Sequence, residues 1–75
     1  MYYDIVASIY DGYRRTDSRL TCGGFSTDEE AVSYINEHEV WEEDYYWLCR
    51  DGETAYIEIE EHNEDGSVCN IITVD

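Results

Sequence analysis

The chain contains no lysine, no proline and no glutamine, and its only basic residues are four arginines. Against these four cations stand 19 carboxylates, which give a formal net charge of -15 over 75 residues. A surplus of this sign repels DNA, RNA and anionic lipid, so we expect neither direct nucleic-acid binding nor membrane binding. A binding partner of this chain is expected to be basic.

Further absences narrow the class of protein. No apolar run approaches the ~20 residues that span a bilayer. The cysteines Cys22, Cys49 and Cys69 are odd in number and include no C-x-x-C pair, so neither a disulfide framework nor a zinc site is predicted. We expect three reduced, half-buried thiols. The first residues lack the basic and apolar blocks of a secretory signal, which favours a cytoplasmic protein.

What the chain does contain is apolar surface. Hydrophobic residues make up 43% of the sequence and aromatic residues 15%, with eight tyrosines and two tryptophans. An acidic disordered tail lacks the apolar groups that offset the loss of chain entropy on folding. The length allows one domain at most, so residues 1–75 are expected to form a single folded domain.

The N-terminal third predicts two strands. In residues 2–10 every second residue is apolar and the residues between them are of mixed type. This alternation is typical of a strand with one apolar face. A turn is expected at Asp11-Gly12. Residues 13–19 are polar and hold three of the four arginines, which predicts a basic loop that pairs with the protein's own acids or anchors an interface. A short second strand is expected over residues 20–25, bent or bulged at its two glycines.

One helix follows. The segment Thr27-Asp28-Glu29-Glu30 fits a capping box, in which Thr27 accepts a hydrogen bond from the Glu30 amide and the Glu30 carboxylate reaches back. Acidic residues in the first turn also suit the positive end of the helix dipole. An amphipathic helix is therefore predicted over residues 28–38, with Ala31 and Ile35 on its apolar face.

Three more strands are expected after the helix, at residues 45–49, 54–61 and 68–74. The Asp-Gly pairs at 51–52 and 65–66 are typical of two-residue hairpin turns. Together these patterns predict an α+β fold of the order ββαβββ, an antiparallel sheet with a single helix packed on one face.

Counting outward from the two turns predicts the register of the strands. The first turn pairs Trp47 with Tyr56, and the second pairs Ile59 with Ile72. Both registers place the apolar side chains on the helix side of the sheet. The outer face is expected to carry Tyr45, Trp47, Tyr56, Glu58 and Glu60, and no element is left to cover it. An exposed aromatic patch on a small protein usually marks an interface.

A catalytic site is not expected. The second turn pairs His62 with Cys69, which are the types of a base and a nucleophile, but it places them near the open end of a ribbon without a pocket. His38 falls at the helix end, where a capping histidine is the commoner case. The acidic turns lack the spacing of a calcium loop, and zinc at His62 and Cys69 is the weaker interpretation. We expect no enzymatic activity, no metal and no cofactor.

The carboxylates fall in rows along the expected elements. One row follows the helix exit, and another lies on the central strand, where Glu58 and Glu60 are about 6.6 Å apart at ~3.3 Å per residue. Phosphates in each strand of DNA follow at a similar order of spacing, about 3.4 Å. Solubility needs a net charge of only about 2–8. The excess indicates mimicry of a phosphate backbone, and mere solvation of the surface is the alternative interpretation.

In composition and expected architecture the whole chain resembles the small acidic inhibitors of phages and mobile elements that mimic DNA, such as anti-CRISPR and anti-restriction proteins. The resemblance rests on no motif, so no functional residue carries over from those proteins. It implies a non-enzymatic inhibitor in the host bacterial cytoplasm. Such an inhibitor occupies the basic nucleic-acid-binding surface of a defence nuclease, a CRISPR effector or a restriction enzyme.

In this hypothesis carboxylates replace phosphates and aromatic side chains pack at the contact. The expected contact residues are Glu37, Glu39, Glu42, Glu43, Asp44, Tyr45, Trp47, Tyr56, Glu58 and Glu60. The alternative hypothesis is a homodimeric structural or adaptor module that buries the aromatic outer sheet face against its twin. A monomer and a homodimer are therefore both open at this point.

Overall fold

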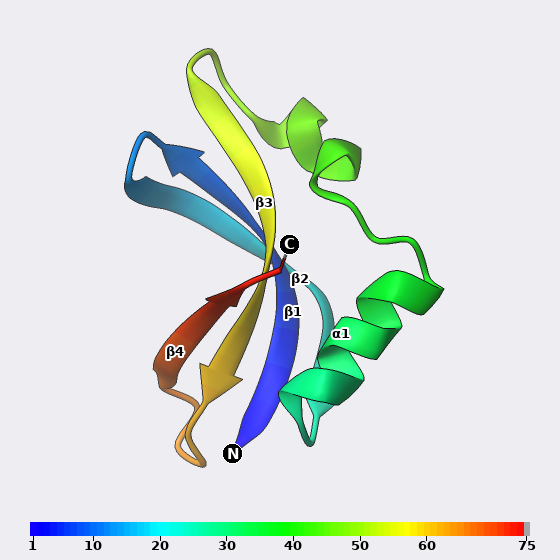
Figure 1. Ribbon diagram of the computed structural model, residues 1–75. Coiled ribbons are helices and arrows are strands. Elements are labelled where there is room, and N and C mark those ends of the chain that lie inside the picture. The colour runs from blue at the N-terminus through cyan, green and yellow to red at the C-terminus, as the bar shows by residue number, and fades with distance from the viewer. Residues whose placement is uncertain (75) are drawn as a thin grey trace.

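The computed structural model of the protein describes residues 1–74. Its elements are β1 (Tyr2–Asp11), β2 (Arg14–Phe25), α1 (Asp28–Glu37), the 3-10 helix η1 (Glu42–Leu48), β3 (Glu53–His62) and β4 (Val68–Thr73). The strands form one antiparallel sheet in the order β2-β1-β3-β4. In Figure 1 both helical segments lie on one side of the sheet, and the ends of the hairpins bend toward the other side. The predicted α+β class with one α-helix on one face is confirmed.

The first hairpin extends further than the sequence predicted. Strand β1 and the Asp11-Gly12 turn are as expected, but β2 begins at Arg14, so the predicted basic loop over residues 13–19 is wrong. These polar residues are accommodated because β2 is an edge strand, which has only one neighbour. The pairing of β1 with β2 contains three register shifts, two of them near the glycines where a bulge was predicted.

The start and end of α1 follow from local hydrogen bonds. The Thr27 hydroxyl accepts a hydrogen bond from the Glu30 amide at 3.2 Å, as the capping box requires. The Glu30 carboxylate reaches back one residue further than expected and accepts from the Ser26 amide at 3.4 Å. At the other end, the His38 amide donates to the Tyr34 carbonyl at 3.0 Å, so His38 caps the helix. The predicted helix is confirmed to within one residue.

The strand expected at residues 45–49 is not formed, because this segment belongs to η1. The Asp44 carboxylate accepts a hydrogen bond from the Trp41 amide at 3.4 Å, and the Asp44 amide donates to the Trp41 carbonyl at 3.1 Å. These contacts start a helical turn in place of a strand. The turn at residues 51–52 exists, but it connects η1 to β3, so the predicted pairing of Trp47 with Tyr56 does not occur. Instead β3 pairs with β1.

The second hairpin has the predicted register over most of its length. Ile59 lies opposite Ile72, as counted from the turn at residues 65–66. A bulge after Glu61 then shifts the pairing, and His62 lies opposite Val68 instead of Cys69. The expected His62–Cys69 pair is therefore wrong.

The hydrophobic core lies between the sheet and α1. Its buried side chains come from β1, α1 and β3: Ile5, Ala7, Ala31, Ile35, Ile57 and Ile59. Val40 and Tyr45 pack against this cluster from the segment that follows α1, so the same core holds η1 on the sheet. Within residues 1–74 no helix has the length and apolar character needed to cross a bilayer.

Candidate functional site

The segment that forms the helical side of the protein is acidic and contributes no basic residue of its own. Residues 20–49 contain no arginine or lysine. They contain eight carboxylates: Asp28, Glu29, Glu30, Glu37, Glu39, Glu42, Glu43 and Asp44. Glu37 is the last residue of α1 and four more of these acids follow it, and all five but the half-buried Glu42 are exposed. The predicted row of acids at the helix exit is therefore accessible to a partner.

Aromatic side chains lie among these acids. Trp41, Tyr46 and Trp47 have 48%, 47% and 73% of their surfaces exposed. We call the exposed aromatics and the acids beside them the α1–η1 surface, which consists of Glu37, Glu39, Trp41, Glu42, Glu43, Asp44, Tyr46 and Trp47. The Arg19 guanidinium lies 5.8 Å from the Trp47 ring centre, a cation–π distance. The Trp47 ring thus has one cation beside it, from the protein's own Arg19.

Tyr45 has a different role from its neighbours. Its ring packs against the hydrophobic core, and its hydroxyl lies 3.1 Å from the Thr21 hydroxyl on β2. It therefore anchors η1 to the sheet and is not displayed beside Trp47 as the sequence predicted.

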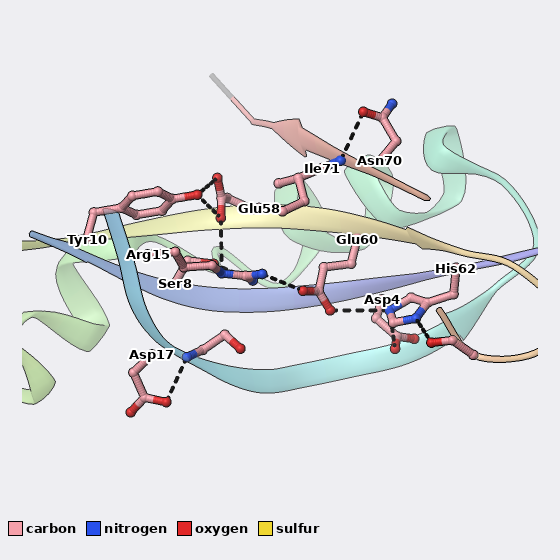
Figure 2. A network of polar contacts seen from close by, with 12 residues as sticks. Asp4, Ser8, Tyr10, Arg15, Asp17, Glu58, Glu60, His62, Asn70 and Ile71 are labelled. Atoms are coloured by element: carbon pink, nitrogen blue, oxygen red, sulfur yellow. Dashed lines mark hydrogen bonds and ion pairs between the residues drawn. The ribbon is translucent and has the colours of Figure 1, made fainter. Parts of the chain in front are cut away.

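The opposite face of the sheet is not covered by any element of residues 1–74, yet its centre is a buried polar network (Figure 2). Arg15 extends from β2 across β1 to β3. Its guanidinium donates to the Ser8 hydroxyl at 2.8 and 3.1 Å and to the Glu60 carboxylate at 2.7 Å, and it lies 3.9 Å from the Glu58 carboxylate. The expectation that the basic segment pairs with the protein's own acids is confirmed for Arg15.

Tyr10 completes one end of this network. Its hydroxyl donates to both Glu58 carboxylate oxygens, at 2.9 and 3.0 Å. Partial burial raises the pKa of Tyr10, and the hydrogen bond to Glu58 raises it further because the carboxylate stabilises the protonated phenol. Glu58 is thus held by a neutral donor on one side and by Arg15 on the other.

His62 occupies the other end of the network (Figure 2). Its Nδ1 donates to the Gly66 carbonyl at 3.0 Å, and its Nε2 lies 3.2 Å from Glu60 and 3.3 Å from Asp4. The Gly66 carbonyl raises the pKa of His62, burial lowers it in part, and the carboxylates of Asp4 and Glu60 raise it again. Tyr2 stacks on the imidazole at a centroid distance of 4.7 Å. The site therefore favours the imidazolium form.

These contacts change the interpretation of the second acidic row. Glu58 and Glu60 do lie on the uncovered face, but Glu58 is only 5% exposed and both carboxylates are bound by internal donors. Tyr56 is on the same face, at 43% exposure, and its ring makes an edge contact with Tyr10. Trp47 belongs to η1 on the α1 side (Figure 1). The structure therefore separates the helix-exit acids and Trp47 from Tyr56, Glu58 and Glu60, and the continuous aromatic patch is not formed.

The three cysteines are free thiols in the described residues. Cys22 and Cys49 are half-buried as expected, but Cys69 is exposed. Partial desolvation raises the pKa of Cys69, and a hydrogen bond to Glu61 adds to this, so the group is held as a thiol. Over residues 1–74 no three histidine, cysteine or carboxylate side chains cluster as metal ligands.

Comparison of the chain with protein family models, with curated proteins and with solved structures finds no match. The functional argument therefore rests on the charge and geometry of the two faces.

The protonation of His62 makes the stability of the fold depend on pH. Because its folded pKa lies above the ordinary value of 6.5, its contribution is fully present below that pH and is lost as pH rises through the folded pKa. We expect the unfolding free energy of the wild type to fall toward that of His62→Gln as the pH is raised from about 6 to 9. Denaturant melts of both proteins across this range measure the difference. An NMR titration midpoint for His62 below 6.5 would contradict the prediction.

Proposed function

We propose that the protein is a non-enzymatic inhibitor that binds the basic nucleic-acid-binding surface of a bacterial defence nuclease by mimicking DNA. The observation that carries this proposal is the α1–η1 surface, where accessible carboxylates lie beside exposed aromatic rings. Within residues 1–74 the ion pairs involve Arg15 and His62 on the other face, and none includes an acid of the α1–η1 surface. The charge there is available to an external cation.

The aromatic side chains add what charge alone does not supply. Tryptophan, tyrosine and arginine dominate the energetics of protein interfaces. A basic groove that binds nucleic acid presents arginine and lysine side chains, and arginine stacks on tryptophan while it pairs with a carboxylate. Trp47 and its neighbouring acids offer both kinds of contact, because 73% of the Trp47 surface stays exposed beside the Arg19 guanidinium.

Burial and internal hydrogen bonds support a smaller set of contact residues in this proposal. The contact is formed by Glu37, Glu39, Glu42, Glu43, Asp44 and Trp47, with Trp41 and Tyr46 added. Glu58 and Glu60 serve the stability of the sheet because their carboxylates bind Arg15 and Tyr10. Tyr45 positions η1. Tyr56 lies outside the contact.

The experiment begins with capture of partners from bacterial lysate at low and high salt, with identification of the bound proteins by mass. A captured nuclease is then titrated with the protein, with and without duplex DNA as competitor. We expect the affinity to fall by about tenfold or more between low and high salt, because screening weakens attraction between charged surfaces. Affinity that is independent of salt, together with simultaneous binding of DNA, would refute the proposal.

A matched pair of variants tests the location of the contact. Glu37→Gln with Glu43→Gln removes two charges from the α1–η1 surface and is expected to weaken binding about tenfold, from roughly 0.7 kcal/mol per charge. Asp11→Asn with Glu64→Gln removes the same charge from exposed hairpin turns and is expected to have little effect. Titration of the nuclease with both double variants measures the difference. Equal weakening by both pairs would mean that only net charge matters.

A further inference from the structure

The two edges of the sheet differ in how they are protected against strand pairing. The β2 edge is irregular, with three register shifts in its pairing, and it carries charged side chains including Arg14, Asp17 and Arg19. Strand β4 has the sequence Val-Cys-Asn-Ile-Ile-Thr and no charged side chain, with Val68 and Ile71 exposed by 45% and 39%. Soluble proteins usually protect an edge with charge, proline or bulges. The regular part of β4, from Asn70 to Thr73, has none of these.

The hydrogen bonds of the second hairpin show which backbone groups of β4 face outward. The Asn63 amide donates to the Ser67 carbonyl at 2.9 Å, so Asn63 directs its backbone groups toward β4. In an antiparallel strand these directions alternate. Ile59 and Glu61 therefore also bond to β4, through their partners Ile72 and Asn70.

The residues of β4 that lie between these bonded partners direct their backbone groups away from β3. They are Ile71 and Thr73. The Ile71 amide accordingly donates to the Asn70 side-chain oxygen, at 3.0 Å (Figure 2). The free edge thus presents two outward-facing residues, separated by one that faces inward.

We propose that β4 is a self-association edge, which pairs antiparallel with β4 of a second copy about a two-fold axis at Ile72. This register sets Ile71 opposite Thr73 of the second copy, and Thr73 opposite its Ile71. Both residues face outward, so the two pairs form four main-chain hydrogen bonds. Ile72 meets its own copy on the helix side, where it already packs against the core. The Asn70 side chain releases the Ile71 amide when the strands join.

The distribution of charge favours a second copy at this edge over self-association through the rest of the surface. Two molecules of charge -15 repel each other over most of their surfaces. Along the seam, β4 adds no charge, and the nearest carboxylates on β3 are already bound. Glu58 and Glu60 are held by Tyr10 and Arg15, and Glu61 accepts from the Tyr3 hydroxyl at 2.9 Å. A basic partner would gain nothing from an uncharged strip, whereas an identical strand matches its pattern of outward groups.

Sedimentation equilibrium from micromolar to millimolar concentration at low and high salt tests this proposal. We expect the mass to rise from 8.8 kDa toward twice that value, and the dimer to become tighter as salt screens the repulsion. This salt dependence is opposite in sign to that of the proposed nuclease contact, so the two proposals fail independently. A mass of 8.8 kDa at every concentration and salt would overturn the self-association edge.

Variants at the β4 edge distinguish pairing through this strand from nonspecific association. Thr73→Pro removes an outward amide and leaves the ladder with β3 intact, so we expect loss of the dimer with an unchanged circular dichroism spectrum. Ile71→Lys is a second variant that we expect to abolish the dimer. Its control is Leu20→Lys, which introduces the same charge at an exposed position of β2 and is expected to leave the dimer intact. Asn70→Ala frees the Ile71 amide and tightens the dimer. Dimerisation that survives Ile71→Lys, or that Leu20→Lys abolishes equally, overturns the proposal.

Discussion

Replacing Arg15 by methionine is expected to lower the free energy of unfolding by about 3 kcal/mol, because removal of one partner of a buried ion pair leaves the other charge uncompensated. The side chains of Glu58 and Glu60 are only 6% and 12% exposed, so water cannot fully replace the guanidinium. Methionine keeps most of the apolar stem, so the loss reports the ion pairs together with the hydrogen bonds to the buried Ser8 hydroxyl. Denaturant unfolding followed by tryptophan fluorescence or circular dichroism measures it.

Arg14→Met provides the control for this prediction. It makes the same chemical change one residue away, at an exposed position of β2, and is expected to change the unfolding free energy by no more than about 0.5 kcal/mol. Adding Glu60→Gln to Arg15→Met is expected to recover part of the lost unfolding free energy, because it removes a buried carboxylate that has lost its cationic partner. Equal destabilisation by the two arginine variants would show that general charge repulsion, and not the network, is responsible.

The network also bears on the proposed function. Arg15 is the arginine that forms ion pairs with carboxylates in residues 1–74, and it does so on the face away from α1. The internal positive charge is thus used where carboxylates are buried and must be neutralised. The acids of the α1–η1 surface stay exposed, where their mutual repulsion is screened by water and salt. This division of charge is consistent with a stable sheet that supports an anionic binding surface.

Local patterns in the sequence were sufficient for the elements with strong signals. The period of two in β1, the capping residue Thr27 and the turn at residues 65–66 each specify a conformation through nearby atoms alone. The register of Ile59 with Ile72 followed from counting outward from that turn. The row of acids at the helix exit could be placed for the same reason, because its position follows from the end of α1.

The other predictions failed because of specific contacts that the pattern of residue types does not reveal. Residues 45–49 are aromatic and apolar, which favours a strand, but Asp44 closes a helical turn on Trp41 and Tyr45 docks into the core. The polar segment that begins β2 resembles a loop until its neighbour is known. Glu58 and Glu60 alternate like exposed residues, and only the reach of Arg15 across β1 shows that they are buried. One pattern in the sequence could have indicated this polar network: the polar residues Asp4, Ser8 and Tyr10 lie on one face of β1.

Replacing Ile35 by alanine is expected to destabilise the protein by about 3–4 kcal/mol, because it removes a fully buried side chain and leaves a cavity between α1 and the sheet. At ~0.05–0.15 kcal/mol per residue, a chain of 75 residues has a total stability of about 4–11 kcal/mol. The loss is therefore a large fraction of the total. The side chains of α1 that are buried are Ala31 and Ile35, so Ile35 supplies most of the apolar attachment of the helix. Denaturant melts measure the change.

Val32→Ala is the matched control for this substitution, because it shortens a β-branched side chain in the same helix. Both changes raise helix propensity by roughly 0.5 kcal/mol, so the difference between them reports packing alone. Val32 is only partly buried, and we expect a loss of about 1 kcal/mol. If the α1–η1 surface is the contact with a nuclease, Ile35→Ala also weakens binding, because the acids at the helix exit depend on where α1 is held. Destabilisation by Val32→Ala as large as that by Ile35→Ala would contradict this account of how α1 is fixed.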